Sequence, residues 1–196
     1  MSRYAGTNDL RTYLNFVGTQ GTALNGFLQT CLDNAEGLIN DYTRRNFAGT
    51  PGTAYYNRYQ QDRVRDNALW LDQDLFSLTG IVNGDSQVIP VGSAWVEPRN
   101  DAPPYRIVRL KSSYVYVWNT DSDVIISGTF GYSTTPPPAI AQSTVRLGAY
   151  LYRQRDVGIT DVAGFQEGGE VTFASGIPSD VRWLLNPYRS KSGGMV

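Results

Sequence analysis

The stretch ALNGFLQTCLDNAEGLINDYTRR, residues 23–45, predicts one long amphipathic helix. Its apolar side chains recur at steps of three and four residues, so they form one stripe that must face a core: Leu24, Phe27, Leu28, Cys31, Leu32, Ala35, Leu38, Ile39 and Tyr42. The opposite side is polar and includes Glu36. Thr22 can cap the helix, and the glycines and proline that follow Phe47 end it.

Three further helices are expected on either side of a β region. Residues 9–16 form a short helix capped by Thr7 or Asn8, and helix resumes after three consecutive prolines, from Ala139 to about Asp156. A short last helix, VRWLLN, opens after residues 178–180 and ends at Pro187. Residues 171–173 form one extended piece within a loop-like segment.

Between residues 50 and 135 the apolar period changes from about 3.6 to 2, which is typical of β-strands. The expected strands are residues 53–60, 67–90, 94–98, 105–110, 113–118 and 123–132. Short turn-rich connections favour antiparallel pairing. The sequence therefore predicts an α+β protein, in which a bundle of about four helices (residues 1–49 and 136–196) is interrupted by an inserted antiparallel β-sheet or small barrel (residues 50–135).

The helix at residues 139–156 has an apolar arc that is too wide for a surface helix. Beside the face made by Ile140, Thr144, Leu147 and Leu151, a second face carries Ala141, Val145, Gly148, Ala149 and Tyr152. Either the helix lies centrally in the monomer, or its second face packs against another copy. We expect both in part, and we assign four residues to a subunit interface: Val145, Gly148, Ala149 and Tyr152.

Composition excludes several classes of function. The 196 residues carry a net charge of −1, so no global field draws the protein to nucleic acid or anionic lipid. The absence of histidine removes the commonest general base and metal ligand, and the single cysteine, Cys31, lies on an apolar stripe. About 18 consecutive apolar residues occur nowhere, so we expect a soluble protein made in the cytosol.

Two acidic motifs offer weak candidate sites. Asn119, Asp121 and Asp123 have the spacing with which a calcium loop begins, but Val124 and Phe130 replace the glycine and glutamate that such a loop needs, so we favour a β-turn. The pair Asp72 and Asp74 could act as the carboxylates of a glycoside hydrolase. Two aspartates on the solvated side of a strand explain the same spacing, and we favour that interpretation.

A mixture of aromatic and basic residues follows at the start of the β region: Tyr55, Tyr56, Arg58, Tyr59, Arg63 and Arg65. Such a set could stack bases and pair phosphates of a single strand, but a sheet edge or subunit contact fits the acidic balance better. We assign no catalytic residue, no metal ligand and no cofactor.

Four pieces of the chain, in this order, resemble the head-tail connector, or adaptor, proteins of tailed bacteriophages: LINDYTRRNF, VIISGTFGYSTTPPPAI, STVRLGAYLYRQRD and PSDVRWLLNPYR. The resemblance implies a structural ring of twelve copies, not an enzyme, which docks beneath the portal protein after DNA packaging. It also implies a virion location at the head-tail junction and contact with the tail, or with a tail-terminator or stopper protein. Packaged DNA would pass through the channel without sequence-specific binding. Compact family members lack the inserted β domain.

The C-terminal segment combines cations with apolar anchors. From Arg182 onward it has no acid, and Trp183 and Tyr188 are residues of the kind that dominate interfaces. We assign portal or partner binding to Arg182, Trp183, Tyr188, Arg189 and Lys191, with Arg146, Arg153 and Arg155 as further candidates. The alternative is that VRWLL packs on the chain's own core. Other functions left open are a carbohydrate-binding or depolymerising phage tail component and a single-stranded nucleic-acid binder.

Overall fold

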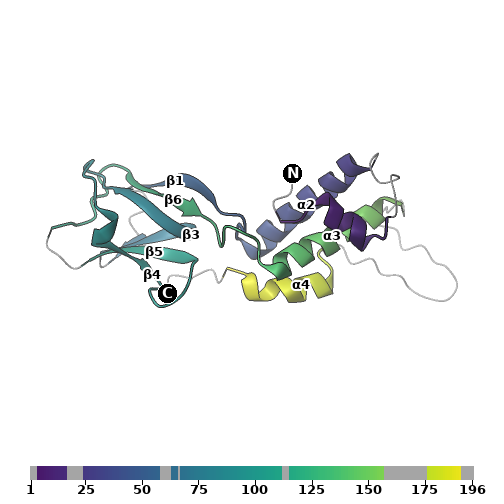
Figure 1. Cartoon of the computed structure of the whole chain (residues 1–196). Helices are drawn as coiled ribbons and strands as arrows, with labels where there is room; N and C mark the ends of the chain where they lie inside the picture. Colours follow the sequence, from purple (N-terminus) through teal and green to yellow (C-terminus); the bar gives the residue numbers. More distant parts are fainter. Residues whose placement is uncertain are drawn as a thin grey trace. The chain divides into compact units, whose positions relative to one another are not determined.

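The computed structural model describes residues 4–16, 24–57, 63–65, 67–111, 115–156 and 176–190 (Figure 1), except the side chains of residues 155 and 156. The chain divides into two compact units: a helical unit, Met1–Arg44 with Pro136–Val196, and a β unit, Arg45–Thr135. The described part contains four α-helices and a six-stranded antiparallel sheet, so the fold is α+β. None of the described helices is both long and apolar enough to cross a bilayer.

The helical unit contains α1 (Thr7–Tyr13), α2 (Asn25–Thr43), α3 (Pro138–Asp156) and α4 (Ser179–Leu185), followed by a 3₁₀ turn (Asn186–Tyr188). Helix α3 contacts each of the other three, which explains why its apolar arc is so wide. The core at its crossing with α1 and α2 consists of Leu10, Leu28, Cys31, Leu32 and Ala149. The central position predicted for this helix thus holds within the helical unit.

The buried stripe of α2 is rotated from the one predicted. Glu36, expected on the polar side, is 8% exposed, whereas Leu38, expected on the apolar stripe, is 40% exposed. The side chains that are fully buried, such as Leu32 and Ile39, centre the stripe nearer to Glu36 at 100° per residue. The prediction was wrong at these two positions because an apolar pattern does not fix the exact centre of a helix face.

The helix ends also differ in detail from the predictions. Gly6, rather than Thr7 or Asn8, caps α1, and its N–H donates to Asp9 Oδ2 at 2.9 Å. Helix α2 ends at Arg44, which takes a left-handed conformation (φ 53°), before the glycines that were expected to stop it. Thr22, the predicted cap of α2, lies outside the described residues.

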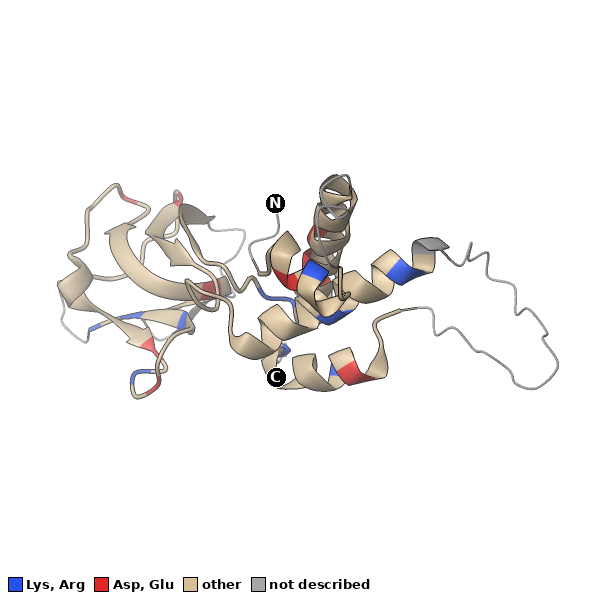
Figure 2. Cartoon of the chain, turned by 45° about the vertical axis from the view of Figure 1, so that its right-hand side comes forward, with Lys and Arg blue, Asp and Glu red and all other residues tan. Residues whose placement is uncertain are grey.

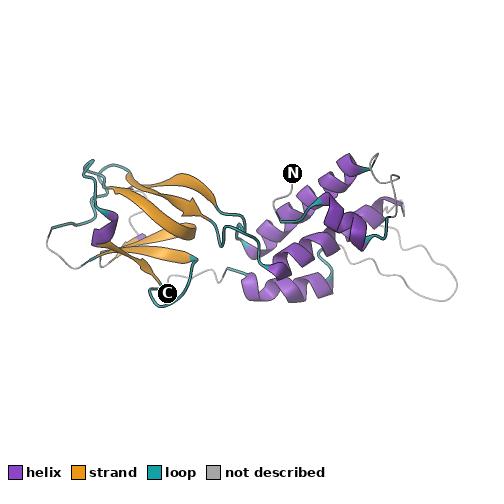
Figure 3. Ribbon diagram, in the orientation of Figure 1, coloured by secondary structure: helices purple, strands orange, loops and turns teal. Residues whose placement is uncertain are grey.

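The β unit forms one sheet with the strand order β1-β6-β3-β5-β4 (labelled in Figure 1; the strands are orange in Figure 3), and β2 pairs with β3. The strands are β1 (Thr50–Tyr56), β2 (Val64–Arg65), β3 (Ala68–Val82), β4 (Ala94–Glu97), β5 (Tyr105–Leu110) and β6 (Val124–Phe130). The first part of β3 pairs with β5 and the second with β6, so both halves of the sheet enclose one apolar core. Strands β1 and β4 lie at opposite ends of this order, so the described strands form an open sheet.

Two strand predictions were wrong in the described part. The run at residues 67–90 stops being a strand at Val82, and residues 115–118 are not a strand although they belong to the alternating motif SYVYVW. The indole N–H of Trp118 instead donates to the carbonyl of Asn67 at 2.8 Å, which holds this segment beside the start of β3. The extended piece expected at residues 171–173 lies outside the described residues.

The start of the β unit is tied to the end of β6. Tyr132 N–H donates to Asn46 O and Gly49 N–H donates to Ser133 O, each at 2.7 Å. Residues 45–49 therefore belong with the sheet rather than with α2. Within the β unit, Arg45 also reaches the carboxylate of Asp74, with Nη1 3.3 Å from Oδ2.

Asp74 corrects a prediction about the pair Asp72 and Asp74. Asp72 is exposed as expected, but Asp74 is only 4% exposed and also pairs with Arg106, whose Nε lies 2.8 Å from Asp74 Oδ1. A register shift between Trp70 and Leu75 breaks the strict alternation on which the prediction depended. The two carboxylates therefore do not share a solvated face, and the buried one is neutralised by arginines.

Candidate partner-binding surfaces

The C-terminal segment is fixed to the end of α2. Ser190 N–H donates to the carbonyl of Thr43 at 2.8 Å, and Tyr42 Oη donates to Asn186 Oδ1 at 2.6 Å. The last carbonyls of a helix have no partner within the helix, so Ser190 satisfies one of them. The guanidinium of Arg189 lies 5.1 Å from the centre of the Tyr42 ring. Residues 186–190 are therefore anchored to the helical unit.

Helix α4 divides its side chains between the core and solvent. Val181 and Leu185, one turn apart, are buried, whereas Trp183 is 74% exposed and Arg182 is exposed beside it. Residues one and two positions after Val181 point away from its face at 100° per residue, so this division follows from helix geometry. The own-core alternative is correct for Val181 and Leu185 but wrong for Trp183.

The arginines assigned to partner binding have different surroundings. Arg146 on α3 forms an ion pair with Asp180 of α4, with Nη1 3.0 Å from Oδ2, so it helps to position α4. Arg153 is exposed on α3. The side chain of Arg155 and the whole of Lys191 lie outside the described residues.

The face assigned to a subunit interface packs within the helical unit. Ala149 is 2% exposed, and a Cβ added to Gly148 would lie 3.1 Å from Leu32 Cδ2, so α2 approaches closely here. Val145 packs against the same core, and the ring of Tyr152 lies 5.6 Å from that of Phe16. The sequence left both a second copy and the long helix open as partners. The long helix is the partner in this structure, and the subunit contact of these four residues stays a prediction.

A buried asparagine joins two loops of the β unit. Asn83 is 2% exposed; its Nδ2 donates to Val117 O and its Oδ1 accepts from Asn119 N, both at 2.9 Å. Gly84 follows, and a Cβ there would lie 2.7 Å from Ser122 O, so no larger residue fits without movement. The loops are thus held together by polar contacts that the strand pattern alone did not reveal.

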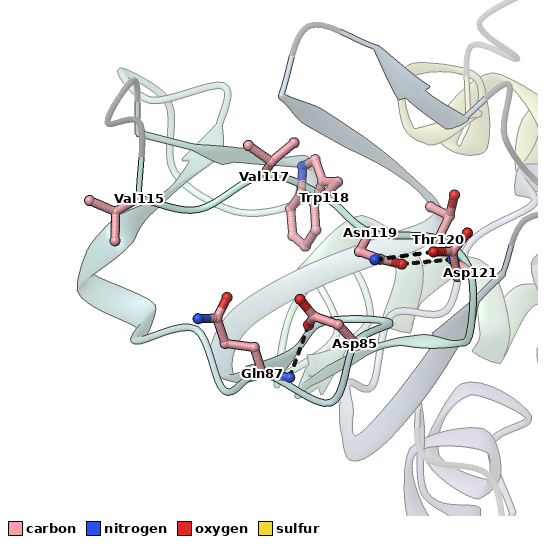
Figure 4. Close-up of a pocket in the computed structure, with 8 residues that line it drawn as sticks. All are labelled: Asp85, Gln87, Val115, Val117, Trp118, Asn119, Thr120 and Asp121. Carbon is pink, nitrogen blue, oxygen red and sulfur yellow. Dashed lines mark hydrogen bonds between the residues drawn. The ribbon is translucent and has the colours of Figure 1, made fainter.

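These loops enclose a pocket of about 480 Å³ (Figure 4). The residues that line it are Asp85, Gln87, Val115, Val117, Trp118, Asn119, Thr120 and Asp121. Asp121 N–H donates to Asn119 Oδ1 at 2.8 Å, a local turn contact that supports the turn interpretation over the calcium loop. The described residues contain no group of three or more histidine, cysteine or acidic side chains placed to hold a metal ion.

A second surface of the β unit is built on Trp95. The guanidinium carbon of Arg99 lies 3.6 Å, and Nζ of Lys111 3.9 Å, from the centre of its ring, which are cation–π distances. Beside it, Arg109 and Glu97 form two hydrogen bonds, of 2.7 and 3.2 Å. The sequence did not reveal this cluster, because Trp95, Arg99 and Lys111 come from separate positions: β4, the loop that follows it, and the end of β5. The one indication in the sequence was that Trp95 alternates with the inward-facing residues of β4, which places it on the outer face of the sheet.

The aromatic residues considered for the two alternative functions divide between the surface and the core of the β unit. Of the proposed base-stacking residues, Tyr55 is 60% exposed, but Tyr56 is 2% exposed and donates to Asp72 Oδ1 at 2.9 Å. Arg58 and Tyr59 lie outside the described residues. The aromatic residue of the loop pocket, Trp118, is 8% exposed, so it offers little surface for a sugar to stack on.

Comparison with known protein families gives no match, and neither does comparison with curated proteins. Solved structures do match, and three of them are chains of gene transfer agent (GTA) particles. One is from the neck of an empty GTA particle computed with C6 symmetry, with a TM-score of 0.58, 18% identity, and coverage of 93% of this chain and 88% of that chain. A chain from the neck of a native GTA particle computed with C12 symmetry has a TM-score of 0.56 and 15% identity, with coverage of 93% of this chain and 90% of that chain. A chain from the virion of a native GTA particle has a TM-score of 0.57 and 16% identity, with coverage of 93% of this chain and 88% of that chain.

These similarities establish the fold, because identities of 15–18% are too low to carry more. A match over 93% of the chain includes the β unit, Arg45–Thr135, as well as the helices. The β unit is therefore shared with the GTA chains, although the compact connectors that the sequence resembles lack it.

Proposed function

We propose that this chain is a structural protein of the neck of a tailed phage or phage-like particle, and not an enzyme. Twelve copies form a ring that docks on the portal protein after DNA packaging and provides the attachment surface for the tail, or for a tail-terminator or stopper protein. Packaged DNA passes through the channel without sequence-specific binding. The chain works at the head-tail junction of the virion, after synthesis in the host cytoplasm.

The observation that carries this proposal is the fold similarity of both units to chains of GTA necks, with TM-scores of 0.56–0.58. The four sequence pieces that resemble connector proteins support it independently. A net charge of −1 also suits a channel through which DNA must move, because few phosphate contacts of cationic side chains would hold the DNA.

The C-terminal segment is the proposed portal-binding surface. Trp183 and Arg182 project from α4 while their neighbours anchor that helix, and exposed tryptophan and arginine side chains are typical of the residues that dominate binding energy. The proposal also includes Tyr188 and Arg189 beyond α4, Arg153 of α3, and two positions outside the described side chains, Arg155 and Lys191. Arg146 contributes indirectly, through its ion pair with Asp180.

Negative-stain electron microscopy of the purified chain, alone and mixed with the portal protein of the same particle, tests the ring. Rings with a central channel are expected in the mixture, and a carbohydrate-binding tail component would give none. Single particles in both samples, with no binding to portal, would show that the proposed function is wrong.

Truncation tests the portal-binding surface. Deleting residues 187–196 should leave the chain folded and soluble but give full heads that leak DNA or fail to accept tails. It removes the contacts of Ser190 and Arg189 with α2, including the hydrogen bond to the carbonyl of the buried Thr43, so a loss of stability of about 1 kcal/mol is expected. Deleting residues 192–196 is the matched control, because it keeps the contacts of Ser190 and Arg189 and also keeps Lys191. If the longer truncation complements a connector-deficient phage at normal titre, the portal contact lies elsewhere, first at Arg153 and Arg155.

A further inference from the structure

The β unit carries an acidic loop surface made by Asp85, Asp121 and Asp123 with the valines Val115 and Val117. Residues 83–90 and 115–124 contain no lysine or arginine, and all three carboxylates are exposed. None of the three has an ion-pair partner in the part of the chain that the structure describes. The two valines are 68% and 66% exposed, so the loop pocket has both an acidic and an apolar wall.

The same unit carries a cationic counterpart, the Trp95 surface, made by Trp95, Arg99 and Lys111. Lys111 Nζ donates to the carbonyl of Gly92. The guanidinium of Arg99 packs on the face of Trp95, and it has no ion-pair partner among the described residues. Arg109 is paired with Glu97, and Asp101 shares the loop of Arg99, so the region has three cations against two acids. The tryptophan holds the unpaired guanidinium in place at the surface, where it can bind a carboxylate.

The two surfaces are built on different strand pairs of the β unit. The acidic loops follow the end of β3 and precede β6, which pair at Val82 and Ile125, whereas Trp95 lies on β4 opposite Arg109 of β5. Figure 2 shows the acidic and basic positions of the chain in red and blue. A ring requires two different surfaces that fit each other, because each copy meets one neighbour on each side. Opposite charge on two surfaces of one unit suits this requirement.

We infer that the Trp95 surface of one copy binds the acidic loop surface of the next copy, with Arg99 entering the pocket between Asp85 and Asp121. The inference rests on the proposed ring and names one of its contacts. A guanidinium suits this pocket because it can hydrogen-bond to the carboxylates while its flat face and aliphatic stem pack against the valines. A nucleic acid would account for the Trp95 surface alone, whereas a second copy accounts for both surfaces.

Charge reversal in the full chain tests the contact. The acid-reversed variant, Asp85→Lys with Asp121→Lys, and the cation-reversed variant, Arg99→Glu with Lys111→Glu, each bring like charges together. Each should raise the concentration for half-assembly of rings by at least about tenfold. An equimolar mixture of the two variants should assemble again, with alternating copies, because each then meets an oppositely charged neighbour. Misfolding of either variant could not be rescued in this way, and Asp41→Lys on the exposed side of α2 is the control.

Mass photometry and negative-stain microscopy of each variant and of the mixture decide between the outcomes. Normal rings from either variant alone would overturn the inference and leave the ring proposal intact. If the wild-type chain forms no ring, alone or on portal, the ring proposal fails. If the mixture of the two charge-reversed variants also stays monomeric, the contact between the Trp95 surface and the acidic loop surface is wrong as well. A cation-reversed variant that assembles normally but loses binding to a fluorescent single-stranded oligonucleotide would assign the Trp95 surface to nucleic acid instead.

Discussion

The helical unit and the β unit satisfy their buried polar groups in different ways. In the helical unit, the buried threonines Thr43 and Thr144 donate to carbonyls one turn back in their own helices, at 2.7 and 2.9 Å. In the β unit, Asp74 and Asn83 reach residues that are distant in the sequence. The hydrogen bonds of these two buried threonines are therefore local, whereas those of Asp74 and Asn83 join separate segments. We expect the helical unit to be most sensitive to volume changes and the β unit to the loss of single polar groups.

The largest effect is expected for Ala149→Trp in the helical unit. Ala149 is 2% exposed at the crossing of α3 with α2, so a tryptophan cannot fit without separating the helices. The free energy of unfolding should fall by at least about 3 kcal/mol. Urea denaturation followed by far-UV circular dichroism measures it, and Gln142→Trp on the exposed side of α3 is the matched control. Unchanged stability in both variants would mean that this face is open and available to a second copy.

Asp74→Ala should give the next largest effect, in the β unit. The carboxylate lies 2.8 Å from Arg106 and 3.3 Å from Arg45, and its loss leaves two cations close together. Both arginines are partly solvated, so we expect a loss of about 3 kcal/mol, the lower end for breaking a buried pair. Asp72→Ala on the exposed side of the same strand should cost about 1 kcal/mol, through its hydrogen bond with Tyr56. Equal losses for the two variants, measured by urea denaturation, would contradict the buried ion pair.

The same difference between the two units explains which features of the structure could be predicted from the sequence. Helical periodicity is a local property, so α2, α3 and α4 were predicted close to their observed positions. The periodicity could not name the partner of the face at Gly148 and Ala149, because an apolar surface suits another helix and another copy equally. The partner became clear only from the approach of Leu32.

In the β unit, the strands were predicted by alternation, but their pairing depends on register. The shift between Trp70 and Leu75 buried Asp74 against expectation, and nothing local in the sequence indicates it. The Trp95 surface is a product of the same pairing, since β4 and β5 place Trp95 opposite Arg109. Sites that depend on strand register therefore could not be predicted from the sequence.

High pH offers a prediction confined to the β unit. Burial, and then the carboxylate of Asp72, raise the pKa of Tyr56 above its ordinary value of 10.0. Above that pH the unfolded chain releases this proton more readily than the folded chain, so stability falls as the pH rises. Above pH ~10, Tyr56 should make the free energy of unfolding fall with pH by up to about 1.4 kcal/mol per pH unit, and below that pH it should have no effect. Tyr56→Phe should remove this part of the slope in urea titrations, and identical slopes would show that the phenol is accessible.

The smallest effect on stability is expected for Trp183→Ser, and it separates folding from binding within one helix. Trp183 is 74% exposed, so its loss should change the free energy of unfolding by less than about 0.5 kcal/mol. Leu185, two residues further on, is fully buried, and Leu185→Ala should cost about 2 kcal/mol or more. In a portal-binding assay the order should reverse once both variants are compared as folded protein: Trp183→Ser should weaken binding at least about tenfold, because exposed tryptophans with no role in the core are typical binding anchors. Normal portal binding by Trp183→Ser would show that α4 is not the portal-binding surface, and the arginines of α3 would be the next candidates.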